Sequence, residues 1–471
     1  MATIQYAGEY KVEVCEILST SGAILDVRDL FSTISIFEDI FQNSITGSIT
    51  LVDTNNLLTN LPIIGQEKLR LKVFTPNADD DTSRTAAINY TETPLYIYKI
   101  ESKTQVNDQT IAYSLGFTTP EAIRNNRIRV SQSFEGEPSE EMVREIIRDP
   151  EILNSKKELY YELTSNNYKF VSPNMRPMDF INGVARRCFS KEYNFAPSFL
   201  FYETVKGFWF RTIDNMMDKE VRWSYSEQTP NVLADGASRT DTEANLHNIL
   251  NYTVVQSVDT MMNMRKGLYG SKLTMVDFVN KTVENFEYNY FEKFNDDVHL
   301  DQYPVASQAQ DDYFNTLSDY PDTCVYMQSV DRDSPGGLFA PRHEGFFDYT
   351  GTDQWLQRRR ARFTSLDAGI VLRIEVPGNT TVQVGDLVQI DLRNTGVLSG
   401  EDRRDPYYSG KYLVRKLRHE FTRGQGVYKH TMHMEVVKDA IGTPYPSTGV
   451  AMQDGGPSTD VIVPTGSSIT N

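Results

Sequence analysis

The C-terminal part of the sequence gathers residue types that bind phosphates and metals. Residues 409–439, SGKYLVRKLRHEFTRGQGVYKHTMHMEVVKD, contain several arginines and lysines and three of the six histidines of the chain. Arginine and lysine contact phosphate backbones, and histidine is a common metal ligand. The stretch therefore raises two chemical possibilities, a nucleic-acid surface and a metal site.

The three histidines do not have the pattern of a metal site. His430 falls on the apolar side of a predicted strand, where a histidine is more often a core residue than a ligand. His433 and His419 fall at the opposite, polar type of position. No carboxylate or cysteine accompanies them at a recognisable ligand spacing. We therefore expect no metal in this stretch.

The positive charges of the stretch must be weighed against the charge of the whole chain. The 471 residues include 47 Lys and Arg and 64 Asp and Glu, which gives a formal net charge of -17. Such a molecule repels a phosphate backbone over its general surface, although it would suit a wall past which DNA slides. We expect four cations to pair with acids of a neighbouring domain or subunit rather than with DNA: Arg415, Lys416, Arg418 and Arg423.

Two further clusters resemble sites without having the required spacing. The first is an arginine run, Arg358, Arg359, Arg360 and Arg362. On a helix these positions spread over more than half the circumference, which is typical of a solvated or subunit-facing surface. The second, FNDDVHLDQ, offers Asp296, His299 and Asp301, but it has neither the oxygen spacing nor the glycine turn of a calcium loop.

No catalytic motif is present. The chain lacks GxSxG, HExxH, a Walker A sequence, and GxGxxG between a strand and a helix. Glu140 and Glu141 are the kind of acid pair that glycoside hydrolysis uses, but one pair among 64 acids carries little weight. We therefore expect a non-enzymatic protein with no catalytic, cofactor-binding or metal-binding residues.

Composition and cysteine usage indicate a folded protein from a reducing compartment. The residues are 39% hydrophobic and 11% aromatic, as in ordinary folded domains. Cys15, Cys188 and Cys324 are odd in number and far apart, which indicates neither a disulfide framework nor a zinc site. The N-terminus lacks the pattern of a cleaved signal, and no window approaches the roughly 18 apolar residues of a membrane span. We expect a soluble protein.

The elements that position these residues are mainly strands. Residues 10–117 contain six segments rich in β-branched and aromatic residues that alternate with a period near two. Helices are expected after Ser139, from Pro177, and over residues 353–366, and a hairpin is expected over residues 198–214 with its turn at Lys206 and Gly207. Strands return after residue 369, whereas residues 245–355 give no clear segmentation.

The fold class predicted from this pattern is mainly β with α+β insertions. Two similar tail-tube-like β-barrel domains are expected at residues 1–118 and 361–440. An α+β middle domain, 119–250, and a second mixed region, 251–360, lie between them. The end, residues 441–471, is rich in Pro, Gly, Ser and Thr and is expected to be a flexible or extended arm.

An internal repeat supports the two β domains. Residues 95–117 align with residues 412–434 without a gap, at a constant offset of 317, so that Ile97 falls on Val414. In both copies the second strand then has one apolar face. Upstream, ITLVD with LRIEV and IIGQEKLRLKV with VQVGDLVQIDL repeat in the same order, and Gly65 is matched by Gly385.

Five stretches of the chain, in their order, resemble the baseplate hub proteins of contractile-tailed, T-even-like bacteriophages. They are FSTISIFEDIFQNSITGSITLVDTNNLL, KFVSPNMRPMDFINGVARRC, FLFYETVKGFWFRTID, MRKGLYGSKLTMVDFVNKT, and VQVGDLVQIDL with YYSGKYLVRKLRHEF. The resemblance covers most of residues 10–440. The region 290–350 and the end after residue 440 depart from the family pattern.

The resemblance implies a structural role. Hub proteins of this family have two tube domains, which resemble the tail-tube protein, and they assemble as homotrimers. Three chains then form a pseudo-sixfold ring that joins the sixfold tail tube to a threefold spike and leaves a channel for DNA ejection. The implied partners are the tail tube, central spike, baseplate wedge and tape-measure proteins. The implied location is the tail baseplate of a virion assembled in the host cytoplasm.

Two other functions stay open at this point. A hub or spike component of a related contractile injection system would share the tube domains. A spike-associated cell-wall glycan hydrolase would need a pair of acids across a cleft or a zinc site, and the sequence offers no motif for either.

Overall fold

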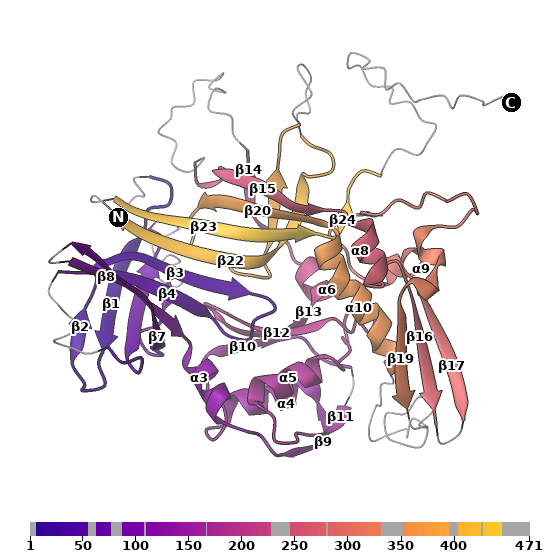
Figure 1. The fold of residues 1–471 in the computed structure, drawn as a ribbon, viewed down its shortest axis with the longest axis horizontal. Helices are drawn as coiled ribbons and strands as arrows, with labels where there is room; N and C mark the ends of the chain where they lie inside the picture. Colours follow the sequence, from indigo (N-terminus) through magenta and orange to yellow (C-terminus); the bar gives the residue numbers. More distant parts are fainter. Residues whose placement is uncertain are drawn as a thin grey trace, which may run out of the picture.

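The structure is a computed structural model, and it describes residues 6–54, 63–76, 87–107, 110–165, 167–227, 245–278, 281–330, 352–394, 404–424 and 427–444. Figure 1 shows a large sheet along the molecule, a mixed region of helices and strands on one side of it, and a small three-stranded sheet that projects at one end. The C-terminal arm predicted at 441–471 lies mostly outside the described residues.

Residues 11–118 form the first β unit. Its strands are β1 (Lys11–Leu18), β2 (Ile24–Asp26), β3 (Phe31–Asp39), β4 (Thr46–Asp53), β5 (Lys68–Phe74), β6 (Ile88–Asn89), β7 (Leu95–Asn107) and β8 (Thr110–Thr118). They are hydrogen-bonded in the order β3-β4-β8-β7-β5-β1-β2, with β6 on β5. The period-two alternation is confirmed, because residues such as Ile34, Ile49 and Leu115 are fully buried in one core.

The second β unit repeats this arrangement. Its strands are β14 (Val221–Ser226), β15 (Asn251–Ser257), β20 (Ile370–Pro377), β21 (Leu387–Asp391), β22 (Gly410–Gly424) and β23 (Val427–Lys438). The order β15-β20-β23-β22-β21-β14 matches β3-β4-β8-β7-β5-β1 of the first unit. One difference is that β14 lies parallel to β21, whereas β1 is antiparallel to β5.

Local backbone geometry confirms the internal repeat. The β7–β8 turn joins Asn107 to Thr110, and the β22–β23 turn joins Gly424 to Val427, at the offset of 317 read from the sequence. A β-bulge after Ile97 recurs at the same offset after Val414. Both matched glycines are left-handed, with φ +84 at Gly65 and +81 at Gly385.

The mixed middle region packs helices on a small sheet. Its elements are α3 (Pro120–Arg127), β9 (Ser133–Pro138), α4 (Ser139–Arg148), β10 (Glu158–Tyr161), β11 (Asn167–Val171), α5 (Pro177–Ala185), β12 (Phe199–Thr204), β13 (Gly207–Thr212) and α6 (Ile213–Met217). The predicted hairpin is present as β12–β13, with Thr204 paired to Gly207. The predicted helix starts are also confirmed, because α4 begins at Ser139 and α5 at Pro177.

The remaining elements form a lobe and the helix that returns to the second unit. They are α8 (Thr260–Arg265), β16 (Gly270–Asp277), β17 (Thr282–Asn289), α9 (Tyr290–Lys293), η1 (Phe294–Asp296), β18 (Tyr303–Pro304), η2 (Leu317–Asp319), η3 (Pro321–Thr323), β19 (Val325–Val330), α10 (Thr352–Ala368) and β24 (Ala440–Ile441). The lobe is the three-stranded sheet β17-β16-β19 with its connections. The fold is thus mainly β with α+β insertions, as predicted.

Candidate functional site: the seam and the open face of the sheet

The two β units are joined edge to edge within one chain. Strand β22 pairs with β3 from Lys416 opposite Asp39 to Thr422 opposite Thr33. We call this pairing the seam. Because the seam is a continuous ladder of main-chain pairs, it makes one sheet out of two equivalent six-stranded arrangements.

The middle region braces the seam from the core side. The buried Glu38 carboxylate on β3 accepts hydrogen bonds from the N–H groups of Val205 (2.8 Å) and Val384 (3.1 Å). Burial raises the pKa of Glu38 to about 7, although these two hydrogen bonds oppose the rise. Glu203 of β12 accepts a hydrogen bond from the N–H of Ile45 at 3.0 Å. The hairpin β12–β13 therefore fixes how the first unit meets the second.

One face of the joined sheet turns away from both cores, and we call it the open face. Its middle is made of short hydroxyl side chains in register across four strands. Ser35 lies opposite Ser48, and Thr33 lies opposite Thr50 on one side and Thr422 on the other. The neighbouring residues on the same strands, such as Ile34 and Ile49, point into the core. The hydroxyl groups border charged side chains, because Ser35 accepts a hydrogen bond from Arg418 at 3.2 Å and lies opposite Glu420.

Beside the hydroxyl strip, the open face carries charges that pair with each other. Arg418 contacts Glu420 at 2.6 Å, and His433 contacts the same carboxylate at 3.3 Å. The Glu435 carboxylate accepts a hydrogen bond from the Arg373 guanidinium at 3.0 Å, and it lies 3.5 Å from the Lys416 ammonium. Apart from Glu420, these residues line a groove of about 620 Å³ that extends from Phe37 to β15. The groove combines cations with acids and does not present one sign of charge.

Two of the four cations singled out in the sequence pair with acids of the neighbouring β unit, as expected. Lys416 lies 3.9 Å from Asp39 and Arg423 lies 3.0 Å from Asp29, and both acids belong to the first unit. The other two cations pair with acids that do not belong to the first unit. Arg415 pairs with Asp367 of α10 and with Glu435, and Arg418 pairs with Glu420 of its own strand.

The positions predicted for the three histidines are correct for two of them and wrong for the third. His430 is buried and His433 faces the open side, as predicted. The prediction for His419 was wrong, because this side chain is fully buried and its Nδ1 lies 3.1 Å from Nε2 of His430. The physical reason is a β-bulge. Strand β7 has a bulge between Ile100 and Ser102, and β22 has none at the equivalent position. Residues at equivalent sequence positions beyond this point therefore face opposite sides of the sheet.

The arginine run is not the solvated or subunit-facing surface that its spacing predicted. Only Arg360 is exposed. Arg358 donates to Asp297 at 2.9 Å and to the carbonyl of Asp296 at 2.8 Å. Arg359 donates to the carbonyls of Pro197 (2.6 Å) and Phe199 (3.0 Å), and burial lowers its pKa to about 9. The run therefore ties α10 to the middle region.

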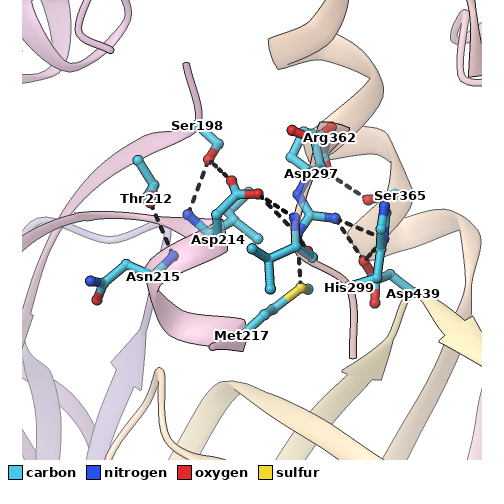
Figure 2. Close-up of polar contacts among 12 residues, drawn as sticks. Ser198, Thr212, Asp214, Asn215, Met217, Asp297, His299, Arg362, Ser365 and Asp439 are labelled. Atoms are coloured by element: carbon cyan, nitrogen blue, oxygen red, sulfur yellow. Dashed lines mark hydrogen bonds and ion pairs between the residues drawn. The ribbon is translucent and has the colours of Figure 1, made fainter. Parts of the chain in front are cut away.

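Arg362 forms the centre of a buried ionic clamp, shown in Figure 2. Its guanidinium contacts Asp439 at 2.7 Å and Asp214 at 3.6 Å, and it also donates to the carbonyl of Val298. His299 Nδ1 lies 2.8 Å from the same Asp439 carboxylate. Burial disfavours the charged form of Asp439, but His299 and Arg362 more than compensate and hold its pKa below the ordinary range. The clamp joins α6, α10, the segment before β18 and the end of β23.

The other sequence candidates have structural contacts. His299 belongs to the clamp, and Asp301 lies 3.7 Å from Lys438. Glu140 accepts a hydrogen bond from the N–H of Thr164 at 3.2 Å, and Glu141 pairs with Arg144. Within the described ranges, no three His, Cys, Asp or Glu side chains are grouped as metal ligands would be. Nor does any helix in those ranges have the length and apolarity needed to cross a membrane.

Sequence reasoning missed two strands of the second unit. Strands β14 and β15 precede residue 361, yet they pair with β21 and β20. Residues 245–355 had no clear segmentation in the sequence, so β15 was not assigned to the second β domain. The signal that points to β15 is the repeat itself, because a unit equivalent to the first needs a strand in the place of β3.

Comparisons with known proteins point to phage tails. No protein-family model matches the sequence. The chain is 24% identical over 271 residues to the probable baseplate hub protein gp334 of Vibrio phage KVP40, which covers 55% of this chain and 58% of the relative. The aligned part is therefore less than two thirds of that relative.

Solved structures share the fold. The tail protein from Neisseria meningitidis MC58 superposes with a TM-score of 0.51 at 11% identity, over 92% of this chain and 98% of that one. The 43 kDa tail protein of prophage MuSo2 from Shewanella oneidensis gives 0.51 at 8% identity, over 92% and 99%. In sequence the chain is therefore similar to a phage baseplate hub protein, and in fold it is similar to proteins described as tail proteins.

Proposed function

We propose that three copies of the chain form a pseudo-sixfold ring in a phage tail baseplate, and that this ring joins the tail tube to the central spike around a DNA channel. The observation that carries the proposal is the seam. One β22–β3 pairing joins two equivalent units within a chain, and the equivalent edges of those units are left for a second pairing between chains.

The first of these edges belongs to β7. Strand β22 uses residues 416–422 to pair with β3, and the matching part of β7 begins at Lys99. On the side away from β8, the described pairing of β7 stops at Tyr96, which lies opposite Lys68. Ile100 and Val106 beyond it are 41% and 61% exposed. A long exposed edge of this kind is a template for another strand.

The second edge belongs to β15, which takes the place of β3 in the second unit. It pairs with β20 on one side, and no strand of the described ranges pairs with its other side. Val254 and Val255 are 40% and 43% exposed there. Pairing β7 of one copy with β15 of the next is a head-to-tail contact, and such contacts produce a closed ring when the rotation between copies closes. The number three rests on the resemblance to hub proteins.

We assign the open face to the channel wall. Its hydroxyl strip and its paired charges give a passing duplex few free cations to contact. Because binding of DNA is driven largely by cations that displace counterions from phosphates, such a wall holds DNA weakly. The rims of the ring would then meet the tail tube and spike, and the C-terminal arm is left for wedge or tape-measure proteins. The ring would be assembled in the host cytoplasm and end in the virion.

Chemical cross-linking tests both the edges and the closure. In a Cys324→Ser background, Ser102→Cys on β7 is combined with Thr253→Cys on β15, and a short bifunctional thiol reagent is added. We expect cross-linked dimers and trimers, with no larger species. The matched control replaces Ser102→Cys by Ile24→Cys, which is also exposed but lies on β2. Equal cross-linking of the control, or a ladder that continues past three, would contradict the ring.

A further inference from the structure

The loop of residues 311–320, which we call the aromatic loop, holds two large apolar side chains in solvent. Tyr313 and Phe314 are each 80% exposed. Phe314 has a left-handed backbone, with φ +62, which is strained for a bulky residue. A single exposed aromatic residue needs no explanation, but a strained pair does.

Side-chain hydrogen bonds hold this loop in one shape. Asp311 accepts the N–H groups of Tyr313 (2.8 Å) and Asn315 (3.0 Å), and it also accepts the hydroxyl of Tyr320. Asp319 accepts the side-chain amide of Asn289 at 3.3 Å, which ties the loop to β17. A preorganised aromatic anchor loses little conformational entropy on docking, and aromatic residues are frequent hot spots of protein interfaces.

The charge around the aromatic loop specifies its partner. Residues 302–330 contain four aspartates and no lysine or arginine. The complementary surface is therefore apolar with lysines or arginines around it.

The first β unit offers such a surface on β5 and β7. It consists of Lys68, Tyr96, Tyr98 and Lys99, and we call it the lysine–tyrosine patch. The ammonium of Lys68 lies 5.2 Å from the Tyr96 ring, and that of Lys99 lies 5.4 Å from the Tyr98 ring. Tyr98 is 42% exposed. Lys99 pairs with Glu101 at 2.9 Å, whereas Lys68 has no ion-pair partner among the described residues and remains available to an acid from outside.

The positions of the two surfaces favour a contact between copies of this chain. The patch includes β7, whose free edge is assigned above to β15 of a neighbour. The aromatic loop packs against the start of β16, where Gly270 meets the carbonyl of Ser318, and the chain reaches this point from β15 through α8. In Figure 1, α8 and α9 lie at one end of the molecule and β1 and β2 at the other. Head-to-tail copies therefore bring the loop of one toward the first unit of the next.

We propose that the aromatic loop of each copy docks on the lysine–tyrosine patch of the next copy. Tyr313 and Phe314 pack against Tyr96 and Tyr98, and Asp312 lies among the lysines. This inference rests on the proposed ring and adds a second contact outside the paired strands. Such a contact fixes the angle between neighbours, which a single pair of strands leaves free to twist.

The test measures self-association by sedimentation velocity over a range of protein concentrations. The variant Tyr313→Ser/Phe314→Ser is compared with Phe278→Ser, a matched control because Phe278 is 74% exposed in the same lobe. We expect the double variant to need at least a roughly tenfold higher concentration for half-assembly, as for loss of a hot spot, and the control to match the unmodified chain.

Charge exchange separates docking from any effect on folding. Asp312→Lys places a cation opposite the patch and is expected to weaken assembly, and adding Lys68→Asp to the same chain is expected to restore it. If the aromatic double variant assembles as well as Phe278→Ser, or the exchange restores nothing, the docking is wrong and the ring stands. If the unmodified chain does not assemble at any concentration, alone or with a candidate spike protein, the ring itself is wrong.

Discussion

At the scale of single residues, the most informative side chains near the seam are two buried histidines. His419 and His430 share one hydrogen bond, and Phe421 stacks on the His430 ring at 4.1 Å between centroids. Tyr10 of the first unit lies against the same ring. Because both imidazoles are fully buried, the pair is stable only while it is neutral.

This pair predicts a loss of stability in acid. Burial lowers the pKa of His419 to about 4 and that of His430 further. The unfolded chain therefore binds more protons than the folded chain below about pH 6.5, so the stabilisation is complete above that pH and is lost as pH falls toward 4. For His419 the loss approaches about 3 kcal/mol.

The measurement is the urea midpoint between pH 7 and pH 4 for the unmodified chain and for His419→Leu/His430→Leu. We expect the double variant to lose part of the acid sensitivity, whereas the exposed His433→Leu keeps it. Equal pH profiles for all three proteins would rule out the histidine pair as the cause.

A second prediction at this scale concerns the ionic clamp. Arg362→Met leaves Asp214 and Asp439 buried without their cation, which costs about 3–5 kcal/mol. Arg360→Met changes an exposed residue of the same run, and we expect less than about 0.5 kcal/mol. Thermal melting of the two variants measures the difference. Similar melting temperatures would show that the clamp contributes little.

At the scale of elements, two matched glycines give a comparison within one molecule. Both Gly65 and Gly385 have left-handed backbones, so alanine at either costs about 1 kcal/mol in strain. A Cβ at Gly385 would also come within 2.4 Å of the Arg211 guanidinium, whereas a Cβ at Gly65 would meet its nearest atom at 3.2 Å. We expect Gly385→Ala to lower the urea midpoint clearly more than Gly65→Ala. The reverse order would show that the Arg211 side chain does not limit the size of the residue at this turn.

The positions of the strands and helices were easier to predict from the sequence than the pairings between strands. Alternation marked the strands of residues 10–117, and proline or serine marked the starts of α4 and α5, because these signals depend on neighbouring residues. The seam depends on a pairing between residues 33–39 and 416–422, which no local pattern specifies. His419 shows the same limit, because the number of bulges decides which side a residue faces. The limits proposed for the five regions remain a prediction.

At the scale of the whole molecule, the charge distribution bears on the proposed channel. The chain has a net charge of -17, and Arg373 and Arg418 on the open face are paired with acids. We therefore expect no binding of linear duplex DNA at physiological salt, measured by fluorescence anisotropy.

Removing an acid of the open face should reverse this behaviour. Glu420→Gln frees Arg418 and His433, so weak DNA binding that falls with salt is expected at low ionic strength. Asp322→Asn, which removes an exposed acid of the lobe, is the control and should leave DNA unbound. Binding by the control alone would argue against the open face as the channel wall.

The measurement that tests the central claim most directly is the mass of the purified chain in solution by light scattering. It is made at low and moderate salt, alone and with a candidate spike protein. A chain of 53.7 kDa that forms the proposed ring gives a species of about 160 kDa, spontaneously or with the spike. A mass that stays at one chain under all these conditions would contradict the ring.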